Sequence, residues 1–135
     1  KKNLGRQRKM KIVFDTYAWI EYFLGTNKGK EVDSYLKDND IITPILVIIE
    51  LNYKSDKEKW DFEPILDFIK SKSTISFIDW DIANISSKNY LEQRKRHKDF
   101  SLVDAIILST AKVYNTKLLT GDKHFIGLDE TVFLD

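Results

Sequence analysis

The sequence contains no cysteine, so disulfide bonds, thiolate metal sites and thiol nucleophiles are excluded. It also lacks the roughly 18 consecutive apolar residues that a membrane-spanning helix needs. The longest apolar run, Ile45 to Ile49, ends at Glu50. The N-terminus is basic and no apolar segment follows it, so no secretory signal is predicted. These absences favour a cytoplasmic protein without a membrane partner.

Proline and glycine are scarce, and no internal repeat, low-complexity tract or linker interrupts the chain. A length of 135 residues, 42% of them apolar, suits one domain with a hydrophobic core. Five basic residues precede Met10. We expect residues 1–9 to be a flexible basic leader, either a tag or an upstream extension; a basic arm that touches RNA is the alternative. Residues 10–135 are expected to form the single domain.

The net charge of +1 depends on that leader. Without its five basic residues, 17 of the 22 basic residues remain against 21 acidic ones, and the net charge becomes −4. An acidic domain is an unusual nucleic-acid binder if side chains alone must attract phosphate. Bound divalent cations would supply the missing positive charge.

Apolar patterning predicts short buried strands that alternate with amphipathic helices. The expected strands are 11–14, 40–42, 74–78, 117–119 and 131–134. The expected helices are 16–24, 31–37, 45–54, 60–70, 81–98 and 101–114. The third of these helices would begin at Thr43-Pro44, with a capping hydroxyl followed by proline. Such alternation implies an α/β fold of three layers, α/β/α, around a mostly parallel central sheet of four to five strands.

Ligand sites in such folds form at the carboxyl ends of the strands. Two acidic residues are expected there, because Asp15 directly follows the first strand and Asp122 the fourth. Each also has a purely structural explanation. Asp15 could cap the following helix, and Asp122 could belong to an ordinary Gly-Asp turn.

Two further acidic residues interrupt apolar helices. Glu50 lies in a helix that is apolar nearly all round, where a buried carboxylate needs a hydrogen bond, a proton or a cation. Pairing with Lys54, four residues later, is an equally good explanation. Asp104 interrupts the apolar helix expected at 101–114, and a capping box with Ser101 would account for it by itself.

The four acids together are harder to explain structurally than each one alone. Carboxylates that meet at one end of a sheet repel one another unless cations neutralise them. Oxygen ligands without cysteine or clustered histidine favour Mg²⁺ or Mn²⁺ over zinc. A carboxylate cluster of this kind suits metal-assisted hydrolysis of phosphodiesters.

Four motifs resemble those of the PIN-domain family. Phe14-Asp15-Thr16 is similar to the opening strand-acid-hydroxyl motif, and Ile49-Glu50-Leu51 to the helical glutamate. Segment 102–111 resembles the third-acid helix, and segment 118–125, which reads Leu-Leu-Thr-Gly-Asp-Lys-His-Phe, closely resembles the closing motif. The resemblance extends from Met10 to the end, so 10–135 is expected to be a single PIN domain.

This resemblance implies a Mg²⁺- or Mn²⁺-dependent endoribonuclease that leaves a 5′-phosphate and a 3′-hydroxyl. Asp15, Glu50, Asp104 and Asp122 would bind the metal, directly or through water. Thr16 and Thr120 would support the carboxylates by hydrogen bonds. Small PIN proteins of this length most resemble VapC-type toxins, which are usually homodimers. The expected partners are therefore an RNA substrate, a cognate antitoxin protein and a second copy of the chain.

Three other interpretations differ in class. The chain could be a PIN-domain RNA-processing nuclease without an antitoxin, a non-catalytic PIN-like RNA-binding or scaffold protein, or a DNA nuclease of the flap-endonuclease type. The presence of all four acids argues against the second interpretation. The short chain argues against the third, because flap endonucleases have additional DNA-gripping elements.

Several remaining features concern the substrate. Tyr17 stands where a small polar residue is commoner in the family, which affects substrate fit rather than metal binding. The aromatic residues of 17–23 are interpreted as core or dimer packing rather than as base-stacking platforms. The basic run 94–98 would either follow an RNA backbone or form a solvated helix C-terminus. His97 and His124 are too far apart in the sequence to propose as an acid–base pair.

Overall fold

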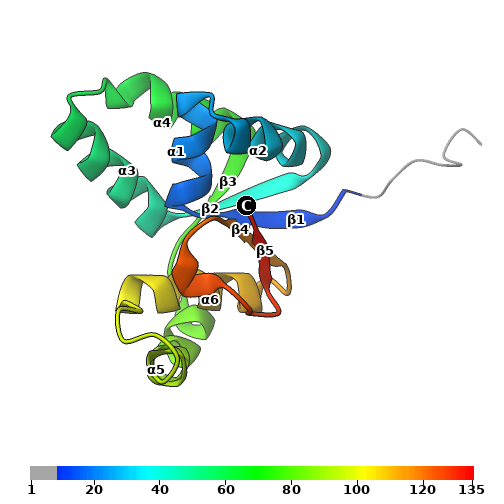
Figure 1. Cartoon of the computed structure of the whole chain (residues 1–135), viewed down its shortest axis with the longest axis vertical. Helices are drawn as coiled ribbons and strands as arrows, with labels where there is room; N and C mark the ends of the chain where they lie inside the picture. The colour runs from blue at the N-terminus through cyan, green and yellow to red at the C-terminus, as the bar shows by residue number, and fades with distance from the viewer. Residues whose placement is uncertain (1–8) are drawn as a thin grey trace, which may run out of the picture.

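A computed structural model describes residues 9–135 of the chain. At its centre lies a sheet of five strands in the order β3-β2-β1-β4-β5, with every neighbouring pair parallel (Figure 1). The strands are β1 (Lys11–Phe14), β2 (Asp40–Pro44), β3 (Ser73–Ser76), β4 (Lys117–Thr120) and β5 (Thr131–Phe133). The expected parallel sheet is thereby confirmed. The expected basic leader lies outside the described residues, apart from its last residue, Lys9.

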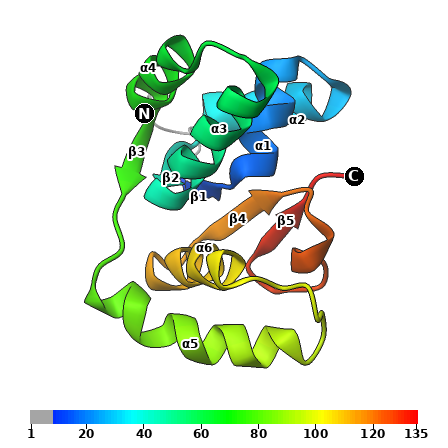
Figure 2. The same ribbon diagram turned by 90° about the vertical axis from the view of Figure 1, so that its left-hand side faces the viewer.

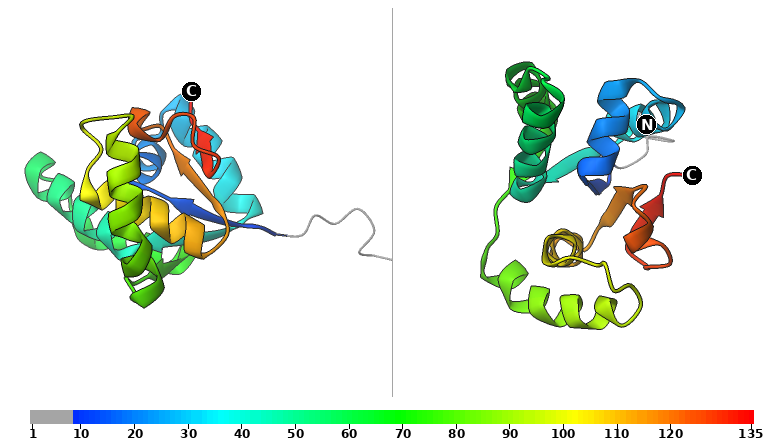
Figure 3. Two further views of the ribbon diagram at one scale, coloured as in Figure 1. Left: turned by 90° about the horizontal axis from the view of Figure 1, so that it is seen from below. Right: turned by 60° about the vertical axis from the view of Figure 1, so that its left-hand side comes forward.

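Helices cover both faces of the sheet. One face is covered by α1 (Thr16–Leu24), α2 (Asn27–Asp38), α3 (Ile45–Glu58) and α4 (Phe62–Lys72) (Figure 2). The other face is covered by α6 (Leu102–Val113), and α5 (Trp80–Arg94) packs against the outer side of α6 (Figure 3). The three-layer α/β/α arrangement is therefore confirmed. No helix in residues 9–135 combines the length and the hydropathy that crossing a membrane requires.

The two central strands form the middle of the core. Val13 and Phe14 of β1, and Leu118 and Leu119 of β4, are completely buried. A central parallel strand is covered on both faces, which explains why these strands are continuous apolar runs rather than alternating ones. Trp19 of α1 packs edge-on against Phe14, with 5.1 Å between the ring centroids. This contact fixes α1 over the carboxyl end of β1.

The chain changes direction across the sheet beside β1. From β1 it proceeds through β2 to the β3 edge, and it then returns across the other face to β4, on the opposite side of β1. The connections that leave β1 and β4 therefore run in opposite directions, towards β2 and towards β5. A crevice between two such strands, outside their carboxyl ends, is the usual ligand site of open α/β sheets. Asp15 and Asp122 lie at this point.

The helix start expected at Thr43-Pro44 is only partly confirmed. Pro44 is the residue before α3 and no side-chain cap is formed. Thr43 belongs to β2, where its buried hydroxyl accepts a hydrogen bond from Trp19 Nε1 at 3.1 Å and contacts Ser73 Oγ at 2.8 Å. The Thr43 hydroxyl therefore hydrogen-bonds within the core instead of capping α3 as the local pattern predicted. Other boundaries shift by up to four residues: α2 begins at Asn27, α3 extends to Glu58 and α5 ends at Arg94.

Candidate metal centre

The four carboxylates come from four separate elements and meet beside the carboxyl ends of β1 and β4. Asp15 precedes α1, Glu50 lies on α3, Asp104 lies in the first turn of α6, and Asp122 precedes the short 3₁₀ helix η1 (Lys123–Phe125). Their negative charges interact: repulsion from Asp122 and Glu50 acts on Asp15, and repulsion from Asp104 and Asp122 acts on Glu50. The structure thus places all four candidate residues near one another, and within residues 9–135 the ligand atoms within 4.8 Å of one another are those of Asp104, Asp122 and His124.

Asp15 is the most deeply buried of the four, with only 4% of its surface exposed. Its Oδ1 accepts a hydrogen bond from the Ala18 backbone N–H at 2.9 Å, so the predicted helix cap is present. Burial is the main reason that the pKa of Asp15 rises to about 7; the neighbouring carboxylates add to the rise, and hydrogen bonds from Thr120 and Ala18 oppose it. A helix cap alone does not require so costly a position for a carboxyl group.

Glu50 lies in a different setting from the one expected. The α3 helix is not apolar and buried all round, because Ile49 and Tyr53 are 59% and 66% exposed. Glu50 itself is half-buried, on the side of α3 that faces α1, where the Thr16 hydroxyl donates a hydrogen bond to its Oε1 at 2.5 Å. Burial, followed by repulsion from Asp104 and Asp122, raises the pKa of Glu50, while the bond from Thr16 lowers it.

The alternative pairing of Glu50 with Lys54 is not formed. Lys54 instead contacts Glu58, with 3.5 Å between Nζ and Oε2. A helix places residues four apart on one face, so Lys54 has an acidic neighbour on each side. The Thr16 hydroxyl is the partner of Glu50, and Glu50 therefore points towards the other carboxylates.

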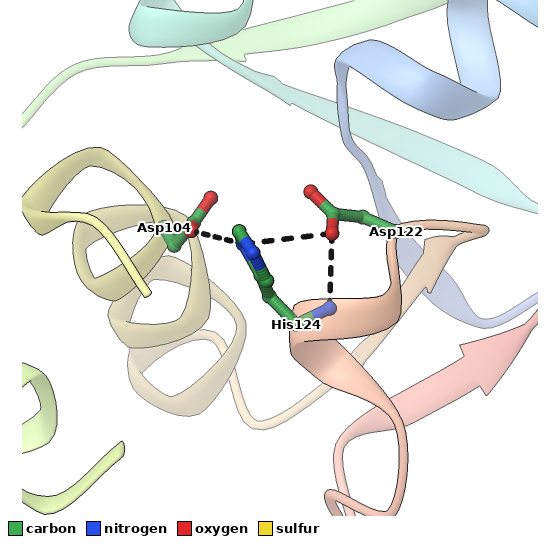
Figure 4. Close-up of side chains that lie close together, drawn as sticks. All are labelled: Asp104, Asp122 and His124. Atoms are coloured by element: carbon green, nitrogen blue, oxygen red, sulfur yellow. Dashed lines mark hydrogen bonds and ion pairs between the residues drawn. The ribbon is translucent and has the colours of Figure 1, made fainter. Parts of the chain in front are cut away.

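Asp104 and Asp122 lie on either side of the His124 ring (Figure 4). The His124 Nδ1 is 2.9 Å from Asp104 Oδ2 and 3.6 Å from Asp122 Oδ1. Because an ionised carboxylate can only accept, Nδ1–H is the donor to Asp104. One ligand atom from each of these residues lies within 4.8 Å of the others. Two carboxylates and an imidazole at this spacing fit one divalent cation.

Both acids also have the structural roles that the local sequence indicates. Asp104 and Ser101 form the predicted capping box, with hydrogen bonds of 2.9 and 3.0 Å in the two directions. Asp122 caps η1 by accepting a hydrogen bond from the His124 backbone N–H at 2.9 Å. Each cap uses one oxygen as acceptor, and a carboxylate has further lone pairs for a cation. The cap and ligand interpretations are therefore compatible.

His124 is the residue that sequence reasoning missed. Its separation from His97 in the sequence does not keep the rings apart: their centroids lie 6.1 Å from each other. The signal was nonetheless local. His124 is two residues after Asp122, and the turn that caps η1 folds its ring back over Asp122 and onto Asp104. The position two residues beyond a candidate ligand in a tight turn is close to that ligand in space.

Thr120 and Gly121 shape the turn that presents Asp122. The completely buried Thr120 hydroxyl accepts a hydrogen bond from the Asp122 backbone N–H at 2.9 Å and also interacts with Asp15. A Cβ atom at Gly121 would lie 2.2 Å from Cε1 of Tyr17, which is too close for any larger residue without movement of the ring. Tyr17 therefore packs against this turn, outside the group of carboxylates.

The two arginines of the basic run 94–98 make contacts within the fold. Arg94 donates to Tyr90 Oη at 2.6 Å. Arg96 donates to Gln93 Oε1 at 2.8 Å and to the Ile126 carbonyl at 2.7 Å, which joins the end of α5 to the turn after η1. These contacts support the interpretation of the run as a helix C-terminus with structural contacts.

A model of the PIN domain family matches residues 12–130. The chain belongs to the PIN domain family. The solved structures that resemble it include a toxin–antitoxin complex from Klebsiella pneumoniae, which is 25% identical with a TM-score of 0.71 and aligns over 92% of this chain and 98% of that chain. None of the curated proteins that were compared with the chain matches it.

Two other similar structures are more distant in sequence. The VapBC2 structure from Rickettsia felis, bound to a DNA fragment from its promoter, is 18% identical with a TM-score of 0.71, and 92% of this chain and 97% of that chain align. A DNA-bound VapBC from Salmonella typhimurium is 15% identical, with the same TM-score and with 92% of this chain and 96% of that chain aligned. At these identities the likeness is one of fold.

Proposed function

We propose that this chain is an endoribonuclease that depends on Mg²⁺ or Mn²⁺ and uses Asp15, Glu50, Asp104 and Asp122 as its metal-binding and catalytic residues. The observation that supports this most strongly is that four carboxylates from four elements meet at the topological switch point of a PIN fold. Burial is the main cause of the raised pKa of Asp15, and repulsion from the neighbouring carboxylates raises it further. A cation would relieve that repulsion. The arrangement is costly for a protein without a metal.

The donor set fits such an ion. Carboxylate oxygens suit Mg²⁺ and Mn²⁺, while the imidazole of His124 is a ligand type that transition metals accept more readily than Mg²⁺. A bound Mg²⁺ or Mn²⁺ would supply activation of a water molecule and neutralisation of charge on the phosphate. Asp104 and Asp122 would hold it directly, and His124 would join them as the tautomer that carries its proton on Nε2, with its Nδ1–H bond to Asp104 given up. Glu50 and Asp15 would bind it directly or through water.

The neighbouring side chains would keep the carboxylates in place. The Thr16 hydroxyl orients Glu50, the Thr120 hydroxyl connects Asp15 to the Asp122 turn, and the His124 ring lies between Asp104 and Asp122. Hydrogen bonds of this kind fix the rotamer of a ligand before metal or substrate binds. The chain's own contribution to cleavage would therefore be a group of hydrogen-bonded carboxylates that positions cation and phosphate.

We further propose that the protein is a VapC-type toxin with a cognate antitoxin, that it forms a homodimer and that it acts on cytoplasmic RNA. The similar solved structures described above are toxin–antitoxin and VapBC complexes. Ile49 and Tyr53, which are 59% and 66% exposed, are four residues apart on α3 and therefore lie side by side, and such an exposed apolar pair would suit contact with another chain.

Cleavage assays decide between the candidate functions. The purified wild-type chain should cut single-stranded RNA only when Mg²⁺ or Mn²⁺ is added, and EDTA should stop the reaction. An RNA-processing PIN nuclease would give the same result, but its gene would have no small antitoxin gene beside it. Metal-dependent binding of RNA without any cleavage would instead favour the non-catalytic interpretation. Mapping the cut sites on cellular RNA after brief induction would then identify the substrate.

Thr16→Val is expected to weaken metal binding about 10- to 100-fold, the usual effect of removing a hydrogen bond to a ligand. Valine retains the shape of the side chain but cannot donate a hydrogen bond to Glu50. Because that bond lowers the pKa of Glu50, its loss should raise the pKa further. Titration of the metal-free protein with Mn²⁺ in a calorimeter measures the change. Thr16→Ser keeps the hydroxyl and should bind nearly as well as wild type. Equal affinities for valine and serine would remove Thr16 from the site.

A further inference from the structure

A shallow open cavity of about 610 Å³ lies beside the candidate metal centre. Asp122 and His124 line one part of it, and Tyr17, Lys28 and Gly121 line another. The cavity therefore adjoins the proposed metal ligands, and its other walls come from α1, α2, the turn after β4 and the C-terminal residues 133–135. Its size is in the range of pockets that hold small organic molecules. A substrate held at the carboxylates would have to extend past or into this space.

Tyr17 is held in a defined place in this cavity. Its ring packs so close to the turn after β4 that Cε1 lies 2.2 Å from where a Gly121 Cβ would be. The residue is only half-buried, so part of the ring remains open to the solvent in the cavity. Gly121 thus allows an aromatic side chain to lie directly next to Asp122.

Lys28 is fixed to the same ring. Its Nζ donates to Tyr17 Oη at 3.0 Å and lies 5.5 Å from the ring centroid. That hydrogen bond is the main reason that the pKa of Lys28 is raised, so the ammonium group remains charged. Within residues 9–135, Lys28 forms no ion pair with a carboxylate at 4.0 Å or less. An ammonium group has three donors, and two are free for another acceptor.

We propose that Tyr17 and Lys28 form a nucleotide subsite, in which the Tyr17 ring stacks on a base next to the cleaved phosphodiester and Lys28 contacts a neighbouring phosphate. This inference rests on the proposed function, because it extends the same site to its RNA substrate. An aromatic ring paired with a cation is the combination by which proteins hold single-stranded nucleic acid. Lys28 also supplies a positive charge that attracts RNA phosphate, next to a group of carboxylates that would repel it.

Packing alone is the competing explanation, since Tyr17 also contacts the hydrophobic core. The two explanations differ in what they require of the side chain. Packing against Gly121 needs bulk, which leucine also provides. Stacking needs a flat aromatic face, which phenylalanine retains and leucine lacks. Charge at Lys28 has no role in packing.

The test measures binding of a short fluorescent single-stranded RNA by anisotropy, with Mg²⁺ present, in an Asp104→Asn background that prevents cleavage. Adding Tyr17→Leu should weaken binding about 5- to 100-fold, the range for loss of one stacked base. Tyr17→Phe keeps the ring but removes the hydroxyl that Lys28 contacts, so it should lose less affinity than Tyr17→Leu. Lys28→Ala should lower the salt dependence of binding by about one phosphate contact. Lys30→Ala, which removes an exposed lysine of the same helix, should leave it unchanged.

Two results would overturn the subsite. One is equal RNA affinity for Tyr17→Leu and the parent; the other is an unchanged salt dependence in Lys28→Ala. Thermal melting checks that each variant is folded, and Lys28→Ala decides the question if Tyr17→Leu is not. The proposed function is rejected if the wild-type protein does not cleave RNA. The subsite alone is rejected if the wild-type protein cleaves RNA and these variants bind RNA as well as the parent.

Discussion

Asp104→Asn is expected to slow metal-dependent cleavage of RNA about a thousandfold while the fold remains intact. Loss of a charged ligand removes several kcal/mol of charge stabilisation from the transition state, and about 4 kcal/mol corresponds to a factor of roughly a thousand. Asparagine keeps an oxygen that can accept the Ser101 N–H bond, so the capping box should survive. Removing one negative charge also lowers the repulsion on Glu50.

Single-turnover cleavage of a labelled RNA at saturating Mg²⁺ measures this effect. Asp129→Asn is the matched control, because Asp129 is exposed and accepts the hydrogen bond from Lys117 with its backbone carbonyl, not with its side chain. The control should cleave at the wild-type rate. Circular dichroism should give the same spectrum for all three proteins. Normal cleavage by Asp104→Asn would reject the assignment of this carboxylate to the site, and a slow, misfolded variant would be recognised by its spectrum.

Asp15→Asn is expected to stabilise the metal-free protein above neutral pH and to abolish most of its stabilisation by Mg²⁺. The folded protein holds the Asp15 carboxyl with a pKa near 7, against a reference value of 3.8. The folded state therefore binds more protons than the unfolded state between these values, and the unfolding free energy of wild type falls as the pH rises from about 4 to about 7. In the middle of this window the slope is about 1.4 kcal/mol per pH unit.

Urea denaturation of metal-free wild type and Asp15→Asn at several pH values measures this contribution. The variant should show a flatter dependence, because asparagine does not titrate, and it keeps the Ala18 cap because asparagine caps as well as aspartate. Added Mg²⁺ should raise the stability of wild type at pH about 8 by mass action, and that of the variant much less. Parallel pH dependences for the two proteins would show that the Asp15 carboxyl is not strained by burial.

Much of the architecture was predictable because its signals are local. The apolar runs at β1 and β4 are continuous because central parallel strands are buried on both faces. Gly25 ends α1 in the left-handed conformation, with a φ of 68°, as its position after the apolar pattern indicates. The capping box of Ser101 and Asp104 was predictable from four residues. Where a structural feature depends on neighbours within one turn, the sequence pattern identified it.

Features that depend on packing between distant segments were predicted less well. The Thr43 hydroxyl accepts a hydrogen bond from Trp19 Nε1 instead of capping a helix, because α1 lies over the end of β2. Glu50 pairs with Thr16 instead of Lys54, because α1 and α3 are adjacent on the same face of the sheet. In both cases a partner within four residues is available, and a partner from another element replaces it. Local sequence patterns cannot predict hydrogen bonds between residues that are 24 and 34 positions apart in the chain.

The sequence by itself determined the α/β fold of parallel strands and the four acidic residues at one end of the sheet. The ends of the strands can be predicted from the apolar runs and the turn residues that follow them. The carboxyl ends of parallel strands lie at the same edge of the sheet, so residues that follow these strands are neighbours. Only the tertiary structure decided how those acids are surrounded. The His124 ring lies between Asp104 and Asp122, and Tyr17 packs against Gly121 beside Asp122. Burial of Asp15 raises its pKa to about 7. Such distances and desolvation depend on how whole layers pack, which no segment of sequence specifies alone.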